Sequence, residues 1–307
     1  MNARINALIK EIKKVLKGKD DVIASVTAAM LAGGHILLED IPGVGKTTLA
    51  VALSKALSLD YRRVQFTPDV LPSDLLGFNM YNAKTGEFEY HEGSVYCNFL
   101  LADEINRTSP KTQSALLEVM EEGRATVDGV TRSLPDPFIV LATQNPFGSA
   151  GTQKLPESQL DRFMICLTLG YPDHKSALDI LNKKLTEKPE VNAVMSVEEF
   201  ADMRAQTDTV FVDASISEFI VSFCENTRSH PLVNLGLSPR GSIALLKMAK
   251  AAAFIAERDY VTPDDVISNI NAVCGHRIVL SSKAKAAHMG AGDVLSEILG
   301  ATALPKM

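Results

Sequence analysis

Lys46 and Thr47 are the residues of this 307-residue sequence whose types and spacing point most directly to chemistry. They follow Gly45 in a Pro/Gly turn that comes after the apolar run 36–38. Glycines let backbone N–H groups approach phosphates, a lysine adds a positive charge, and a threonine hydroxyl is a ligand for Mg²⁺. We therefore predict a phosphate-binding loop made of consecutive residues: Asp40, Ile41, Pro42, Gly43, Val44, Gly45, Lys46, Thr47 and Thr48.

One position of this loop departs from the strict pattern, which has glycine where this chain has Asp40. Aspartate tolerates turn geometry better than most residues, and Pro42 restricts the loop further. Taken alone, the stretch is also compatible with a plain strand–turn–helix corner that carries an exposed lysine.

Asp103 and Glu104 form a second candidate site at the end of the apolar run 99–102. An apolar run that ends in acids is typical of a buried parallel strand, and ligands of such folds lie at the carboxyl ends of the strands. We expect Asp103 to help hold Mg²⁺ and Glu104 to orient or deprotonate the attacking water. The alternative is a strand that is simply followed by a polar turn.

The elements that must position these residues alternate between strands and helices. Besides the strand before the loop, we predict strands at 61–67, 99–104, 138–146 and 164–169, with helices between them. Asn145 lies at the tip of the third of these strands and could reach the γ-phosphate or the water near Glu104. The pattern indicates an α/β fold with a parallel sheet.

Two arginines are further candidates. Arg162 precedes a predicted strand, on the side of the sheet away from the strand tips, so it is better placed for a neighbour's nucleotide than for its own. Arg240 falls in the first turn of a helix capped by Ser238, where the helix dipole disfavours a cation unless an anion lies nearby. The alternatives are a surface ion pair of Arg162 with Asp161 and an Arg240 that points to solvent.

Two hairpins and one acidic helix end complete the candidate features. Residues 78–90 and 126–131 are predicted to form hairpins, the first projecting from the sheet. The helix that begins at Ser109 ends with Glu118, Glu121 and Glu122, where carboxylates oppose the helix dipole. These acids face either a partner's cations or the solvent.

Composition sets broad limits. A formal net charge of −6 gives no general attraction to nucleic acid or anionic membranes. The four cysteines, Cys97, Cys166, Cys224 and Cys274, are far apart and indicate neither a zinc site nor a disulfide framework. Lysines interrupt the N-terminal apolar residues, and no apolar run is long enough to cross a membrane, so we expect a cytoplasmic protein without stable membrane insertion.

We predict two domains, an α/β domain over residues 1–190 and a smaller all-α domain over residues 191–307. From about Val191 the sequence becomes helical and alanine-rich, and the alternation of strands and helices stops.

Four ordered segments of the sequence resemble the MoxR family of AAA+ ATPases. They are PGVGKT at 42–47, ADEINR at 102–107, ATQNP at 142–146 and LPESQLDRF at 155–163. An acidic residue at position 40 is a variant associated with this family. The resemblance implies a P-loop AAA+ parallel-sheet domain with helices on both faces, followed by a small helical lid.

The resemblance also implies roles for individual residues and for the assembly. Lys46, Thr47, Asp103 and Glu104 match the Walker A and Walker B positions, and Asn145 matches sensor 1. Arg162 matches the arginine finger of an adjacent subunit's site, and Arg240 matches sensor 2, which reaches the γ-phosphate from the lid. The hairpins match the helix-2 and pre-sensor-1 inserts. The implied cofactors are ATP and Mg²⁺, and the implied partners are a hexameric homo-oligomer, a client protein and often a von Willebrand factor A-domain protein.

We therefore expect a MoxR-type ATPase that hydrolyses Mg-ATP to remodel or mature partner proteins. The alternative is an ATP-gated interaction or assembly module whose hydrolysis is incidental. A DNA-dependent motor is disfavoured by the acidic charge balance, and a GTPase by the lack of an Asn-Lys-x-Asp motif, because Leu185 follows residues 182–184.

Overall fold

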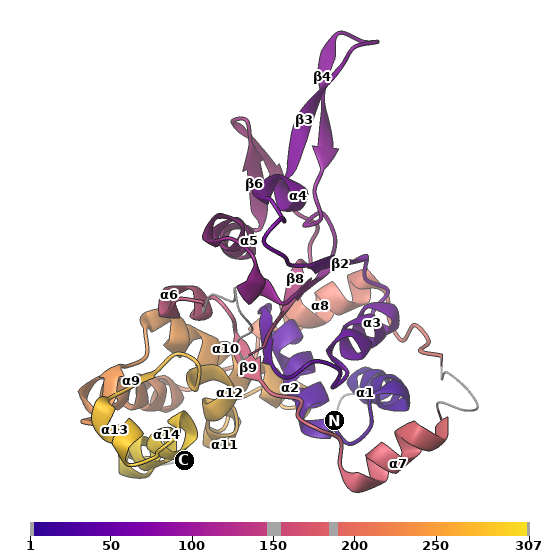
Figure 1. The fold of residues 1–307 in the computed structure, drawn as a ribbon. Coiled ribbons are helices and arrows are strands. Elements are labelled where there is room, and N and C mark those ends of the chain that lie inside the picture. The colour runs from indigo at the N-terminus through magenta and orange to yellow at the C-terminus, as the bar shows by residue number, and fades with distance from the viewer. Residues whose placement is uncertain (1–2, 146–154, 184–189, 306–307) are drawn as a thin grey trace.

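The computed structural model describes residues 3–145, 155–183 and 190–305 (Figure 1). Its centre is a five-stranded sheet in the order β2-β5-β8-β1-β9, and every neighbouring pair is parallel. The strands are β1 (Ile36–Glu39), β2 (Tyr61–Gln65), β5 (Phe99–Asp103), β8 (Ile139–Gln144) and β9 (Ile165–Leu167). The predicted parallel sheet is confirmed, and β1 lies near its middle, so its carboxyl end is flanked on both sides.

Helices cover both faces of the sheet, as predicted. Successive side chains of a strand point to opposite faces, so Ile36 and Leu38 belong to one hydrophobic cluster and Leu37 to another. The first face packs on α1 (Ala3–Val15), α2 (Asp20–Leu31) and α3 (Lys46–Ala56). The second face packs on α4 (Pro72–Leu76) and α5 (Pro110–Glu122).

Helix α5 runs from the carboxyl end of the sheet to its amino end. Near its start, Gln113 Nε2 donates to the carbonyl of Ile105, in the short 3₁₀ helix η1 (Ile105–Arg107) that follows β5. Near its end, the carbonyl of Met120 lies 2.9 Å from Nε2 of His35, the residue directly before β1. The acidic C-terminus of α5 therefore lies at the amino ends of the strands.

Two antiparallel hairpins project on the same side of the molecule, as Figure 1 shows. They are formed by β3 (Gly77–Asn82) with β4 (Glu87–Glu92), and by β6 (Arg124–Val127) with β7 (Val130–Ser133). Both predicted hairpins are confirmed. They also contact each other: the Arg132 guanidinium lies 3.6 Å from the centre of the Tyr90 ring, and Asn79 Nδ2 donates to Asp128 Oδ2 at 2.6 Å.

The remaining chain is mainly helical. Its elements are α6 (Glu157–Leu160), α7 (His174–Lys183), α8 (Val197–Asp208), α9 (Ala214–Ser229), α10 (Pro239–Ile255), α11 (Pro263–Ile267), α12 (Ile270–Cys274), α13 (Ser282–Ala286) and α14 (Ala291–Ala301). The helical second domain also contains a short antiparallel ribbon of β10 (Val233–Leu235) and β11 (Val279–Leu280), which the sequence did not signal. The domain boundary at 190/191 stays a prediction.

No helix within the described residues is long and apolar enough to cross a membrane, and the cytoplasmic location stays a prediction. The four cysteines are free thiols. Burial raises the pKa of Cys97 to about 12 and that of Cys224 to about 11, so these side chains are buried as neutral, small hydrophobes.

Candidate functional site

The loop between β1 and α3 has the open backbone that a phosphate requires. Gly43 and Gly45 have φ of 87° and 107°, in the left-handed region that favours glycine. A Cβ added at Gly43 would meet no atom within 4 Å, so that side of the loop is open. Gly45 is the N-cap of α3, which aims the positive end of the helix dipole at the same space.

Lys46 is held inside this loop. Its side chain is buried, and Nζ donates to the carbonyl of Asp40 at 2.8 Å. Burial lowers the pKa of Lys46, while the charges of Asp103, Asp40 and Glu104 oppose that shift. A buried ammonium with one backbone acceptor is suited to an incoming anion.

The contacts of the Asp40 side chain explain why aspartate stands where the strict pattern has glycine. Its carboxylate is buried, and Oδ1 accepts from the N–H of Ile41 at 3.0 Å, while Oδ2 accepts from the N–H of Gly170 at 2.8 Å. Gly170 lies just beyond β9. The Asp40 side chain therefore ties the start of the phosphate loop to the neighbouring strand, a connection that glycine could not make.

Asp103 lies at the carboxyl end of β5, directly beside the loop. Its Oδ1 accepts from the hydroxyl of Thr143 at 2.6 Å, and its Oδ2 accepts from Arg63 at 2.7 Å. The parallel register of β5 with β8 brings Thr143 to this position, since Ala102 pairs with Ala142. Asp103 thus presents a buried carboxylate at the carboxyl edge of the sheet, the edge from which the phosphate loop also leaves.

Glu104 has φ of 59°, an uncommon value for a non-glycine residue, and its N–H donates to Thr143 Oγ1 at 2.8 Å. Its Oε2 accepts from Gln65 at 3.1 Å and from Arg107 at 2.7 Å. This left-handed backbone conformation ends β5 and makes Glu104 the N-cap of η1.

Asn145 follows β8, and its carbonyl accepts from Asn106 Nδ2 at 3.3 Å. The Oδ1 of Asn106 is buried and has no hydrogen-bond partner among the residues that the structure describes. A buried acceptor that lacks a donor is costly unless water or a ligand completes it. Pro146, the last residue of the predicted strand, lies outside the described residues.

These residues fit a triphosphate with Mg²⁺. Thr47 and Asp103 offer the oxygen ligands that Mg²⁺ prefers, and the loop offers N–H groups and a buried cation. The unpartnered Asn106 oxygen and the open side of Gly43 provide unfilled polar space beside them. Lys46, Asp103, Glu104 and Asn145 thus lie at the same edge of the sheet, and their roles stay predictions.

Four residues of this edge were missed: Arg63, Gln65, Asn106 and Thr143. Arg63 and Gln65 alternate on β2, whose register pairs Gln65 with Asp103. The available signal was the presence of polar side chains at alternate positions near the end of this strand. The neighbouring strand ends in acids.

Arg162 and Arg240 do not join this edge. Both contact Glu121 at the end of α5: Arg162 Nε lies 3.2 Å from Oε2, and Arg240 Nη2 donates to Oε1. The expectation that Arg240 reaches over this chain's own nucleotide is not met, because Glu121 lies beside Met120, at the amino end of β1. The phosphate loop lies at the opposite end of that strand.

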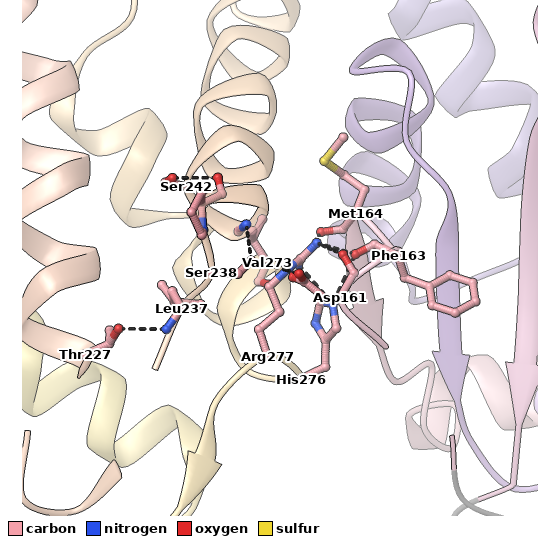
Figure 2. Close-up of polar contacts among 12 residues, drawn as sticks. Asp161, Phe163, Met164, Thr227, Leu237, Ser238, Ser242, Val273, His276 and Arg277 are labelled. Atoms are coloured by element: carbon pink, nitrogen blue, oxygen red, sulfur yellow. Dashed lines mark hydrogen bonds and ion pairs between the residues drawn. The ribbon is translucent and has the colours of Figure 1, made fainter. Parts of the chain in front are cut away.

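The alternative partner considered for Arg162 is wrong. The carboxylate of Asp161 is occupied by the helical domain instead, since Arg277 Nε donates to Oδ1 at 2.9 Å and Ser238 Oγ donates to Oδ2 at 2.8 Å. Figure 2 shows Asp161 between these two residues. Arg277 also donates to the carbonyls of Phe163 and Met164. The segment that carries Arg162 is therefore fixed to the domain that carries Arg240.

Comparisons with known proteins agree with this arrangement. The family described as "ATPase family associated with various cellular activities (AAA)" matches residues 35–165, and the AAA lid domain matches residues 225–298. The uncharacterized protein YeaC of Bacillus subtilis is 50% identical over 299 residues, covering 97% of this chain and 93% of that protein. Chaperone MoxR1 of Mycobacterium tuberculosis is 35% identical over 308 residues, covering 97% and 82%. The crystal structure of a protein designated an ATPase, from Cytophaga hutchinsonii, matches with a TM-score of 0.92 and 38% identity, covering 99% of this chain and 95% of that chain.

Proposed function

The chain belongs to the MoxR family of AAA+ ATPases, and from this premise we propose that it hydrolyses ATP with Mg²⁺ to remodel or mature partner proteins. The observation that carries the proposal is that Lys46, Asp103 and Glu104 all follow parallel strands of one sheet and so lie at its carboxyl edge. The similarity to a protein named a chaperone supports the remodelling role.

Each residue of the edge has a role in this proposal. Lys46 and the loop N–H groups bind the phosphates, while Thr47 and Asp103 hold Mg²⁺. Bound Mg²⁺ would supply charge neutralisation on the phosphate oxygens. Glu104 accepts the proton of the attacking water, and Asn145 orients that water or the γ-phosphate. Gln65 and Arg107 both donate to Glu104 Oε2, so Oε1 would accept the proton in this proposal.

Arg162 and Arg240 act on the nucleotide of another copy of the chain in this proposal. They lie at the amino end of β1, whereas the chain's own phosphate loop follows its carboxyl end. A ring of identical protomers, with six members in the expected form, would place this pair against the next protomer's triphosphate. A client protein and a von Willebrand factor A-domain partner remain proposed partners.

ATP turnover by single variants tests the chemistry. Glu104→Gln removes the proton acceptor and should nearly abolish turnover, and Arg162→Ala should lower it by about 10³- to 10⁵-fold, as loss of an arginine finger does. Wild-type rates for both variants would contradict the proposal. An ATPase rate unchanged by added DNA would exclude the DNA-motor alternative.

Mixing two inactive variants tests the arrangement between protomers. Lys46→Ala protein cannot bind ATP but still presents its arginines, whereas Arg162→Ala protein binds ATP but lacks the finger. A mixture should recover part of the turnover, because some sites then combine one intact half from each variant. No recovery at any mixing ratio would place Arg162 in its own protomer's site.

A further inference from the structure

Glu121 is the one carboxylate that Arg162 and Arg240 share. Each of its oxygens contacts one guanidinium, with Oε2 3.2 Å from Arg162 Nε and Oε1 bonded to Arg240 Nη2. The three side chains are partly exposed, at 39% for Glu121, 29% for Arg162 and 44% for Arg240. Two cations on one anion leave a net positive charge on an accessible surface.

Both ends of this contact are locally unfavourable. Glu121 lies in the last turn of α5, which contains no basic residue, and Arg240 lies in the first turn of α10, which contains no acidic residue. In each helix the charge opposes the nearby end of the helix dipole. The Glu121 charge is compensated by Arg162 and Arg240, and the Arg240 charge is compensated by Glu121 across the contact between the two domains.

The segments that carry the two arginines are held by contacts of the residues beside them. Ser238 bonds Asp161 and also caps α10, since its Oγ accepts from the N–H of Gly241 at 3.1 Å. The residues next to Arg162 and Arg240 are therefore tied to one another. Without an anion between them, the two guanidinium groups would repel each other, and their long side chains would separate.

We propose that Glu121 is a positioning residue that holds Arg162 and Arg240 together as one anion-receiving pair. When a neighbouring protomer presents a triphosphate, the phosphate oxygens replace the Glu121 carboxylate, because they carry more charge. Glu121 thus sets the positions of the two guanidinium groups before the triphosphate binds, and it does not contact the reacting atoms itself. This inference rests on the proposed action of the pair between protomers.

The test is Glu121→Gln, with Glu122→Gln as the matched control. Glu122 lies one residue further along the same helix end, is exposed, and pairs with Arg124 at 2.7 Å instead. We expect Glu121→Gln to lower kcat by about 10- to 100-fold, the scale on which misplacing a catalytic group lowers turnover. KM for ATP should stay within about twofold, because each chain's own loop binds the nucleotide. Glu121→Asp, which keeps the charge, should restore part of kcat, and Glu122→Gln should behave as wild type.

A second readout needs no turnover. In nucleotide-free, dilute protein, sulfate should raise the thermal midpoint of Glu121→Gln more than that of wild type or Glu122→Gln, because the freed arginine pair takes up the anion. Equal sulfate dependence in all three proteins, or an unchanged kcat, would overturn the inference.

A double-mutant cycle separates this inference from the proposed function. In the Arg162→Ala/Arg240→Ala background, Glu121→Gln should have no further effect, since it acts through those side chains. If the two arginine variants are fully active, the proposed function fails. If they are inactive while Glu121→Gln is not, only the role of Glu121 fails.

Discussion

Arg277 in the lid and Asp161 in the α/β domain form an ion pair with Nε and Oδ1 2.9 Å apart, and the Arg277 side chain is only 2% exposed. Burial lowers the pKa of Arg277, and the charge of Asp161 opposes that shift. The guanidinium also donates to the backbone carbonyls of Phe163 and Met164 (Figure 2). This single side chain therefore joins the two domains.

Removing Arg277 should destabilise the protein strongly. Breaking a buried pair from one side leaves the Asp161 carboxylate without its cation, a loss of about 3–5 kcal/mol in the free energy of unfolding. Arg277→Lys should recover only part of this free energy, since an ammonium cannot reproduce the planar set of N–H donors of a guanidinium. Urea unfolding measures this, with Arg124→Ala as the control, because its exposed pair with Glu122 contributes at most about 1 kcal/mol. Equal losses for Arg277→Ala and Arg124→Ala would contradict the prediction.

Restoring the glycine of the strict pattern at Asp40 should harm the protein. Asp40→Gly leaves the N–H groups of Gly170 and Ile41 without their acceptor, at a cost of about 1–3 kcal/mol for each buried group left unpaired. Asp40→Asn keeps one acceptor oxygen and should lose less. Chemical denaturation and ATP affinity check this prediction. A glycine variant that is as stable as wild type would show that the tie to Gly170 is dispensable.

His35 should make stability depend on pH. Its Nδ1 accepts from the N–H of Val140 at 3.0 Å, so the ring must be neutral there, and burial lowers the pKa of His35 to about 4 from 6.5. Below pH 6.5 the His35 ring binds a proton in the unfolded chain but not in the folded chain. The free energy of unfolding therefore falls as the pH drops from 6.5 towards 4. The full loss from this ring is about 3 kcal/mol.

Denaturation across this pH range measures the effect. His35→Gln removes the titrating ring and should flatten the slope between pH 6.5 and 4, whereas His91→Asn, on the exposed part of a hairpin, should keep it. His276, whose pKa burial lowers to about 3, contributes in the same direction and remains in both variants. An unchanged slope in His35→Gln would refute the assignment.

The projecting hairpin should tolerate polar substitution at its exposed aromatic residues. Phe88 is 72% exposed and Tyr81 56% exposed, so Phe88→Ser and Tyr81→Ser should change stability by no more than about 0.5 kcal/mol and leave ATP turnover intact. Arg132→Ala removes the cation from the Tyr90 ring and should cost about 1–2 kcal/mol. Thermal unfolding compares them, and larger losses from the exposed residues would reverse this order.

The sequence predicted the strands, the caps and the loop because each depends on local signals. Asp103 and Glu104 end an apolar run, and Ser109 precedes Pro110, so both features were visible in a few residues. Contacts between residues that are far apart in the sequence had no such local signal. Nothing near Glu121 indicates that its cations are Arg162 and Arg240, and nothing near Asp40 indicates Gly170, because these contacts arise only when β9 and the lid are packed.

Arg240 shows the same limit in a different way. Its unfavourable position in the first turn of α10 correctly indicated a nearby anion, but local charge could not say which anion. The structure supplies Glu121, whose own misplaced charge was also recognised, and only the fold brings the two observations together.

The contacts between the two hairpins have a mechanical consequence. One hairpin follows α4 and the other continues directly from α5, yet Arg132 against Tyr90 and Asn79 against Asp128, in the turn of the second hairpin, hold the two together. A shift of α5 along its axis would therefore move both hairpins together. The contacts between the two hairpins therefore couple them into one mechanical unit.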